Sequence, residues 1–152
     1  IVFDEWLWAD LADQNETTRL REDFLLLNKT FERCDQLVIV DGSPFVEKFW
    51  HFAKMAQIIE IKGIVKMFKN RFMFNSEKAE RWKDNELCSI PKELEALVKD
   101  DDQYLVRAYL TAGADVLVTT DGPLLEVLNQ HRIHCCRRED FLWDYLYGNM
   151  VV

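Results

Sequence analysis

The sequence predicts an α/β fold, and three observations carry that prediction. Short apolar runs rich in β-branched residues, at 36–40 and 116–118, are typical of buried parallel strands. Longer stretches between them repeat apolar residues at every third or fourth position, as amphipathic helices do. Strands and helices alternate along the chain, which favours three α/β/α layers around a central, mainly parallel sheet of four to five strands.

Length and composition indicate one domain over residues 1–152. The chain is 49% apolar, which is ample for a core of ordinary density. It has no run of eighteen apolar residues, and acids stand near its start where a signal peptide would carry basic residues. We therefore expect a cytoplasmic protein without a membrane span.

The first half of the chain predicts two strands that each lead into a helix. Residues 1–3 predict a strand that ends at Asp4, and a helix is expected over 17–34. After the strand at 36–40, Ser43 is suited to cap the next helix and Pro44 to occupy its first position. Glu47 then falls in the opening turns of that helix.

The second half repeats this alternation. We expect a short helix from Asn75 or Ser76 to about residue 84, then a helix that Asp101 opens and Gly113 stops. The strand at 116–118 should be closed by Asp121, with Gly122-Pro123 starting another helix. A last strand at 133–136 and a closing helix at 138–147 complete the prediction.

A motif in this half resembles the second half of a PIN domain. An Asp-x-x-x-Leu-x-x-Ala pattern precedes Gly-Ala-Asp-x-x-Val-Thr-x-Asp-x-x-Leu-Leu, and its members are Asp101, Leu105, Ala108, Gly113, Ala114, Asp115, Val118, Thr119, Asp121, Leu124 and Leu125. Residues 139–142 also resemble the end of the toxin-like PIN subfamily. The resemblance implies a single PIN-like domain and a metal-dependent nuclease.

Four acids match the positions at which the resemblance implies catalytic residues and metal ligands: Asp4, Glu47, Asp101 and Asp121. Two follow strands and two begin helices, and a parallel sheet brings such positions to one edge. Crowded carboxylates with oxygen ligands alone favour Mg²⁺ or Mn²⁺. Thr119 is placed to hydrogen-bond a carboxylate ligand or a phosphate oxygen.

Each acid also has an ordinary structural explanation. Asp4 is suited to cap a helix, and Glu47 to interact with a helix dipole. Asp41, at the end of the second strand, is a rival carboxylate in the same region.

The net charge of −8 is unevenly distributed. Residues 48–83 carry nine lysines and arginines against three acids. Lys66, Lys69 and Arg71 are therefore candidates for binding phosphates, with nearby aromatic residues for unpaired bases. The alternatives are a solvated helix face and a surface for a second subunit or an antitoxin.

The resemblance implies an endoribonuclease that hydrolyses RNA phosphodiester bonds, often as the toxin of a toxin-antitoxin pair and commonly as a homodimer. The alternative is an inert PIN-like scaffold that binds RNA or a protein partner without cutting. Trp6 motivates this alternative, because the family has Asn or Ser there, and so does Gly122-Pro123, where a lysine is common.

The four cysteines lack the Cys-x-x-Cys spacing of a metal site, so reduced, partly buried thiols are expected. The adjacent Cys135 and Cys136 should face opposite sides of a strand. A zinc site with His131 and His134 is the alternative, but residues on one strand cannot all face one tetrahedral ion.

Overall fold

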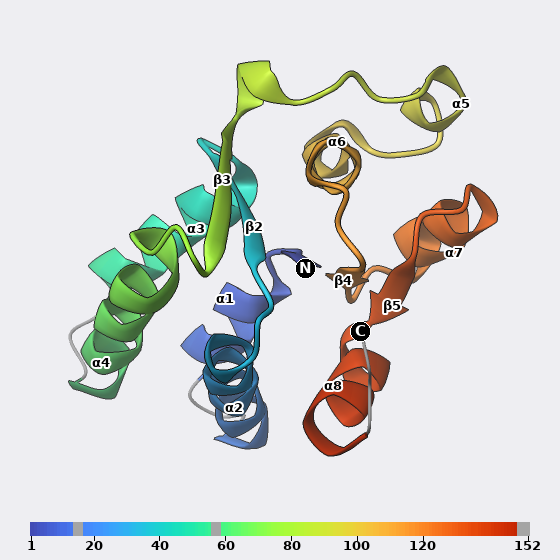
Figure 1. Cartoon of the computed structure of the whole chain (residues 1–152). Helices are drawn as coiled ribbons and strands as arrows, with labels where there is room; N and C mark the ends of the chain where they lie inside the picture. The colour runs from blue at the N-terminus through green and yellow to red at the C-terminus, as the bar shows by residue number, and fades with distance from the viewer. Residues whose placement is uncertain (14–16, 56–58, 149–152) are drawn as a thin grey trace.

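The computed structural model describes residues 1–13, 17–55 and 59–148, and strands alternate with helices through most of them (Figure 1). The elements are β1 (Val2–Phe3), α1 (Trp6–Ala12), α2 (Thr17–Glu32), β2 (Leu37–Asp41), α3 (Pro44–Lys54), α4 (Ile59–Phe68), the π-helical turn η1 (Lys69–Met73), β3 (Ala79–Lys83), the 3₁₀ turn η2 (Asp84–Glu86), α5 (Lys92–Glu95), the 3₁₀ turn η3 (Asp100–Asp102), α6 (Gln103–Ala112), β4 (Leu117–Thr119), α7 (Gly122–Gln130), β5 (Cys135–Arg137) and α8 (Arg138–Tyr147).

The strands form two small parallel sheets that adjoin at β1. One sheet has the order β1-β4-β5, and the other pairs β2 with β3. The Val38 amide donates a hydrogen bond of 2.9 Å to the Ile1 carbonyl, which places β2 beside the start of β1. The predicted α/β class and the parallel pairing are confirmed, but in place of the predicted single sheet of four to five strands the described residues form one sheet of three strands and one of two.

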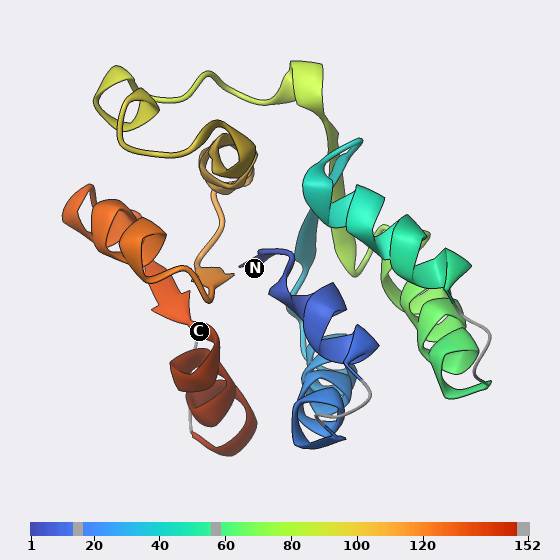
Figure 2. The ribbon, with the colours of Figure 1, turned by 180° about the vertical axis from the view of Figure 1, so that it is seen from behind.

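Apolar side chains alternate between the two faces of the strands. In β2, Leu37 and Ile39 join one buried cluster, while Val38 and Val40 join the other. The first cluster includes residues of α1, α2, α3, α4 and α8, and the second includes residues of α6 and α7. Figures 1 and 2 show α6 on the side of the strands opposite to α2 and α8. Helices therefore cover both faces.

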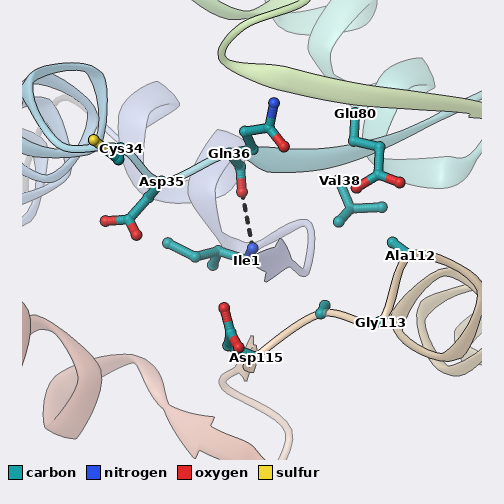
Figure 3. A pocket seen from close by; sticks show the side chains of 10 residues that line it. Ile1, Cys34, Asp35, Gln36, Val38, Glu80, Ala112, Gly113 and Asp115 are labelled. Carbon is teal, nitrogen blue, oxygen red and sulfur yellow. Dashed lines mark hydrogen bonds between the residues drawn. The ribbon is translucent and has the colours of Figure 1, made fainter. Parts of the chain in front are cut away.

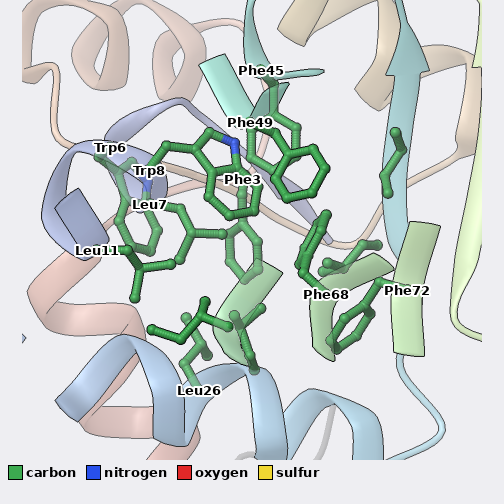
Figure 4. Close-up of a cluster of buried hydrophobic side chains, with 14 of the residues drawn as sticks. Phe3, Trp6, Leu7, Trp8, Leu11, Leu26, Phe45, Phe49, Phe68 and Phe72 are labelled. Carbon is green, nitrogen blue, oxygen red and sulfur yellow. The ribbon is translucent and has the colours of Figure 1, made fainter. Parts of the chain in front are cut away.

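Trp8 lies at the centre of the first cluster. Its ring centroid lies 4.7 Å from that of Phe68, 4.9 Å from that of Phe49 and 5.2 Å from that of Phe45 (Figure 4). Because Trp8 belongs to α1, this packing fixes the short helix that follows the end of β1.

Residues 79–83 form strand β3, so the predicted helix from Asn75 or Ser76 to about residue 84 is wrong. The Asn75 side chain accepts a hydrogen bond from the Glu77 amide two residues later, which caps a turn. The strand then pairs in parallel with β2. Glu, Arg and Lys in this stretch favour helix locally, but they also suit an edge strand, and the partner strand supplies the hydrogen bonds that decide the outcome.

Helix α6 begins later than predicted, because Asp101 lies inside the turn η3 and Asp102 occupies the N-cap position. The predicted stop at Gly113 is confirmed. Gly113 has a φ of 59°, a left-handed conformation that glycine adopts without steric cost. The predicted strand at 116–118 is observed one residue later, and α8 matches its predicted bounds.

A buried ionic cluster joins three helices of the first face. Arg138, the first residue of α8, is only 3% exposed. Its Nε lies 2.6 Å from Asp10 Oδ2 in α1, and its Nη2 donates to Asp23 Oδ1 in α2 at 2.9 Å. Glu22 Oε2 accepts a further bond of 3.2 Å. Glu139 Oε1 lies 3.9 Å from Nη1, so one buried cation interacts with four carboxylates.

This imbalance predicts that stability falls as pH rises. Burial raises the pKa of Asp23 from 3.8 to about 8, against the opposing charge of Arg138 and with the help of Asp10. The folded state thus keeps a proton on Asp23 that the unfolded state releases. The stabilisation from this proton is fully present below the pKa of Asp23 in the unfolded state, and it is lost as pH rises through the pKa of Asp23 in the folded state. Between these two pKa values, we expect the free energy of unfolding to fall by up to about 1.4 kcal/mol per pH unit.

Urea unfolding at several pH values tests this expectation. Asp23→Asn keeps the shape of the side chain and removes its titration, so the variant should show a flatter pH profile than the wild type over the same window. Asp140→Asn, at an exposed position of α8, is the control and should keep the wild-type slope. Parallel profiles for wild type and Asp23→Asn would contradict the expectation.

Candidate active site

The parallel pairing of β1 with β4 brings two predicted acids to the same edge. Phe3 lies opposite Val118 in the register, and the Asp4 amide donates to the Val118 carbonyl at 3.1 Å. Asp4 is therefore the first residue after β1 and lies beside Thr119, the last residue of β4. Asp121 comes two residues after Thr119 in the sequence. Parallel strands expose their carboxyl ends at one edge, which is where open α/β sheets place ligands.

Thr119 connects these two acids. It is fully buried, and its Oγ1 donates a hydrogen bond of 2.7 Å to Asp4 Oδ2. The same oxygen accepts a bond of 3.0 Å from the Asp121 amide. Asp4 Oδ1 in turn accepts from the Glu5 amide at 2.6 Å. The Asp4 carboxylate is thus held in one orientation.

Asp121 also caps the helix that follows. Its Oδ1 accepts from the Leu124 amide at 3.0 Å at the start of α7, as predicted for a helix beginning at Gly122-Pro123. Its Oδ2 lies 3.9 Å from Lys99 Nζ. One oxygen therefore fixes the carboxylate, and the other lies near an exposed cation.

Asp102 lies closer to these acids than the sequence suggested. Asp101, the predicted residue, is exposed, whereas Asp102 is half-buried. Burial raises the pKa of Asp102, and the charges of Asp4 and Asp121 raise it further. The third aspartate of this edge is therefore the one at the N-cap of α6.

Glu5 is a second residue that sequence reasoning missed. Burial raises its pKa to about 7, the neighbouring Asp4 carboxyl adds to the shift, and Lys48, whose Nζ lies 3.6 Å from Glu5 Oε1, opposes it. Burial raises the pKa of Tyr104 as well, with contributions from Glu5 and Asp4. The signal in the sequence was the acid directly after Asp4.

Glu47 lies in the first turn of α3, as predicted, and is exposed. Ser43 caps this helix by accepting from the Val46 amide at 3.4 Å. The rival carboxylate Asp41 is engaged elsewhere, because Arg81 Nη2 lies 2.6 Å from its Oδ1.

The acids at the edge have the donor chemistry that Mg²⁺ or Mn²⁺ prefers, since carboxylate oxygens are hard ligands. The charges of Asp4 and Asp121 raise the pKa of Asp102, and a cation would relieve that repulsion. Within residues 1–13, 17–55 and 59–148, however, no three His, Cys, Asp or Glu side chains are grouped closely enough to hold a metal ion. The donors fit the ion chemically, and the acids are gathered without a complete ligand set.

The predicted phosphate-binding residues lie away from this edge, in α4 and η1. Lys69 Nζ lies 4.9 Å from the ring centroid of Trp50. Arg71 donates to Asn28 Oδ1 at 2.7 Å. Lys66 is exposed. Two of the three candidates therefore make contacts within the fold.

The four thiols are free, as expected, and Cys135 and Cys136 pack on opposite faces of β5. Burial raises the pKa of Cys135 to about 12. His134 Nδ1 lies 2.9 Å from the Asp115 carbonyl, and His131 Nδ1 lies 2.8 Å from the Val127 carbonyl. These contacts occupy the imidazoles within the fold.

A cavity of about 230 Å³ lies at the opposite end of the strands (Figure 3). Ile1, Asp35, Glu80 and Asp115 are among the residues that line it, and Ile1 precedes β1 whereas Asp4 follows it. The cavity is therefore separate from the edge at which the acids gather.

No protein-family model and no curated protein matches the chain at a significant level. The resemblance to PIN domains consequently depends on the residues quoted from the sequence. None of the helices in the described parts of the chain is long and apolar enough to cross a membrane.

Proposed function

We propose that the protein is a Mg²⁺- or Mn²⁺-dependent endoribonuclease of the PIN type. One observation supports this above the others: Asp4 and Asp121, which lie far apart in the sequence, meet at the ends of two paired parallel strands and are joined through Thr119. This is the arrangement that the resemblance implies for metal-binding acids. A role as a toxin, an antitoxin partner and a homodimer remain predictions from the resemblance.

In the proposed site, Asp4 and Asp121 are the metal ligands, and Asp102 joins them in place of the exposed Asp101. Glu5 contributes further negative charge beside Asp4, and the role of Glu47 as a metal ligand stays a prediction from the resemblance. Thr119 acts by orienting the Asp4 carboxylate and the backbone before Asp121. A divalent cation held there would stabilise the negative charge that develops on a phosphate during hydrolysis.

A second candidate function is an inert scaffold that binds RNA or a protein. Trp6 favours it, because the indole Nε1 donates to the Val118 carbonyl at 2.9 Å inside the protein. The resemblance implies Asn or Ser at this position, whereas the Trp6 side chain here stabilises the fold through its hydrogen bond to the backbone. The two candidates differ in whether the acids bind a metal and whether RNA is cut.

The deciding experiment combines calorimetric titration with Mn²⁺ and incubation with single-stranded RNA in the presence of Mg²⁺, Mn²⁺ or EDTA. Asp121→Asn should lower cleavage by more than about 100-fold, the upper range for removing a residue that supports a ligand. The fold should survive, because asparagine caps helices as well as aspartate does. Asp140→Asn is the control and should leave cleavage unchanged.

Metal-dependent cleavage that persists undiminished in Asp121→Asn would refute the assignment of this site. Absence of both Mn²⁺ binding and cleavage in the wild type would favour the scaffold instead.

A further inference from the structure

Two lysines flank the acids of the proposed site. Lys48, in α3, places Nζ 3.6 Å from Glu5 Oε1, and Lys99, between α5 and η3, places Nζ 3.9 Å from Asp121 Oδ2. In Figures 1 and 2, α3 and the segment from α5 to α6 lie on opposite sides of β1. The two lysines therefore belong to elements on different sides of β1.

Both lysines are available to an external ligand. Their side chains are 61% and 78% exposed, respectively. Exposed ion pairs contribute at most about 1 kcal/mol each, because water and salt screen them. Either lysine can exchange its carboxylate for a phosphate at little energetic cost.

Several other cationic side chains form ion pairs with carboxylates elsewhere in the fold. Arg81 pairs with Asp41 at 2.6 Å, Arg107 with Asp84 at 2.9 Å, and Arg138 is buried with its acids. Among the ion pairs that the structure records in its described parts, only those of Lys48 and Lys99 involve Glu5 or Asp121. The cations best placed for a phosphate at this edge are thus outside the set Lys66, Lys69 and Arg71.

We infer that Lys48 and Lys99 bind the phosphate backbone of single-stranded RNA on the two sides of the acids. The inference deepens the proposed function and rests on it. When a cation neutralises the carboxylates, the lysines lose their present partners and contact phosphates instead. They are positioning residues for the substrate, and the carboxylates remain the metal ligands.

The test measures binding of a short fluorescent oligouridylate at several NaCl concentrations, with Ca²⁺ in place of Mg²⁺ to prevent cleavage. In the double variant Lys48→Gln/Lys99→Gln, the slope of log affinity against log salt should decrease by about 1.4, or about 0.7 for each lost phosphate contact. The matched control is Lys54→Gln/Lys62→Gln, which removes the same charge from exposed positions at the end of α3 and in α4. The control should keep the wild-type slope.

Calorimetric titration with Mn²⁺ separates this inference from the proposed function. The double variant should bind Mn²⁺ at least as tightly as the wild type, because the lysines no longer compete for the carboxylates. An unchanged salt slope in the double variant, an equal decrease in the control pair, or no RNA binding by the wild type would each overturn the inference. Loss of Mn²⁺ binding in the double variant would also overturn it, because the lysines would then serve to hold the carboxylates.

These outcomes leave the proposed function separately testable. Wild-type cleavage that requires metal, together with an unchanged slope in Lys48→Gln/Lys99→Gln, would refute the lysines alone. A decreased slope without any metal binding or cleavage in the wild type would refute the nuclease and leave the RNA-binding role of the lysines.

Discussion

Replacing Arg138 with methionine is expected to lower the free energy of unfolding by about 3–5 kcal/mol, the usual cost of removing one partner from a buried ion pair. Methionine has a similar length, so the main loss is the charge and its hydrogen bonds. Asp23 is fully buried and Asp10 is 8% exposed, so water cannot replace the guanidinium. The loss should appear as a lower urea midpoint with an unchanged m-value.

The size of this loss should depend on pH. The charge of Arg138 lowers the pKa of Asp23, so without Arg138 the Asp23 carboxyl stays protonated to higher pH, and the destabilisation should be smaller in mildly acidic buffer than in mildly basic buffer. Arg21→Met, at an exposed position of α2, is the matched control and should change stability by less than about 0.5 kcal/mol. Equal effects of the two substitutions would show that the buried cluster contributes no net stability.

Local sequence patterns predicted those elements in which the spacing of apolar residues along the sequence matches the positions that are buried in the structure. The run 36–40 is apolar at each of its last four positions, and it forms β2 with both faces covered. Gly113 ends α6 because its left-handed backbone is a local requirement that a single residue meets. Both features depend on nearby sequence alone.

Strand β3 was missed because its stability comes from a partner about forty residues away. Ala79 pairs with Leu37 and Lys83 with Asp41, and no local pattern in the charged stretch reveals that pairing. Sequence patterns fail for the same reason to predict any edge strand in which polar residues dominate, because hydrogen bonds from the neighbouring strand override the helix propensity of these residues.

The sequence allowed us to predict which acids of the candidate site follow strands, but not which neighbouring acids join them. Asp4 and Asp121 meet because parallel strands align their carboxyl ends, which a sequence pattern can indicate. The choice between Asp101 and Asp102 depends on one turn of 3₁₀ helix before α6, and propensity does not resolve a shift of one residue. No role was predicted for Glu5, because its burial became evident only from the packing around it.

Replacing Trp8 with alanine is expected to lower the free energy of unfolding by about 3–5 kcal/mol, as for other buried tryptophans. Trp8 is 2% exposed and its ring packs between Phe45, Phe49 and Phe68, so the neighbours cannot collapse into the space without losing contacts among themselves. Trp143→Ala is the matched control. Trp143 is 68% exposed in α8, and its loss should cost less than about 0.5 kcal/mol.

Circular dichroism is the suitable signal for both urea titrations, because each variant lacks a fluorescent tryptophan. The expected loss would also weaken the proposed site, because Trp8 anchors the helix that begins directly after Asp4 and Glu5. Trp8→Ala should therefore bind Mn²⁺ more weakly than Trp143→Ala under conditions where both are folded. A loss below about 1 kcal/mol for Trp8→Ala would mean that α1 is held mainly by the hydrogen bond from Trp6 to Val118 and by the ion pair of Asp10 with Arg138.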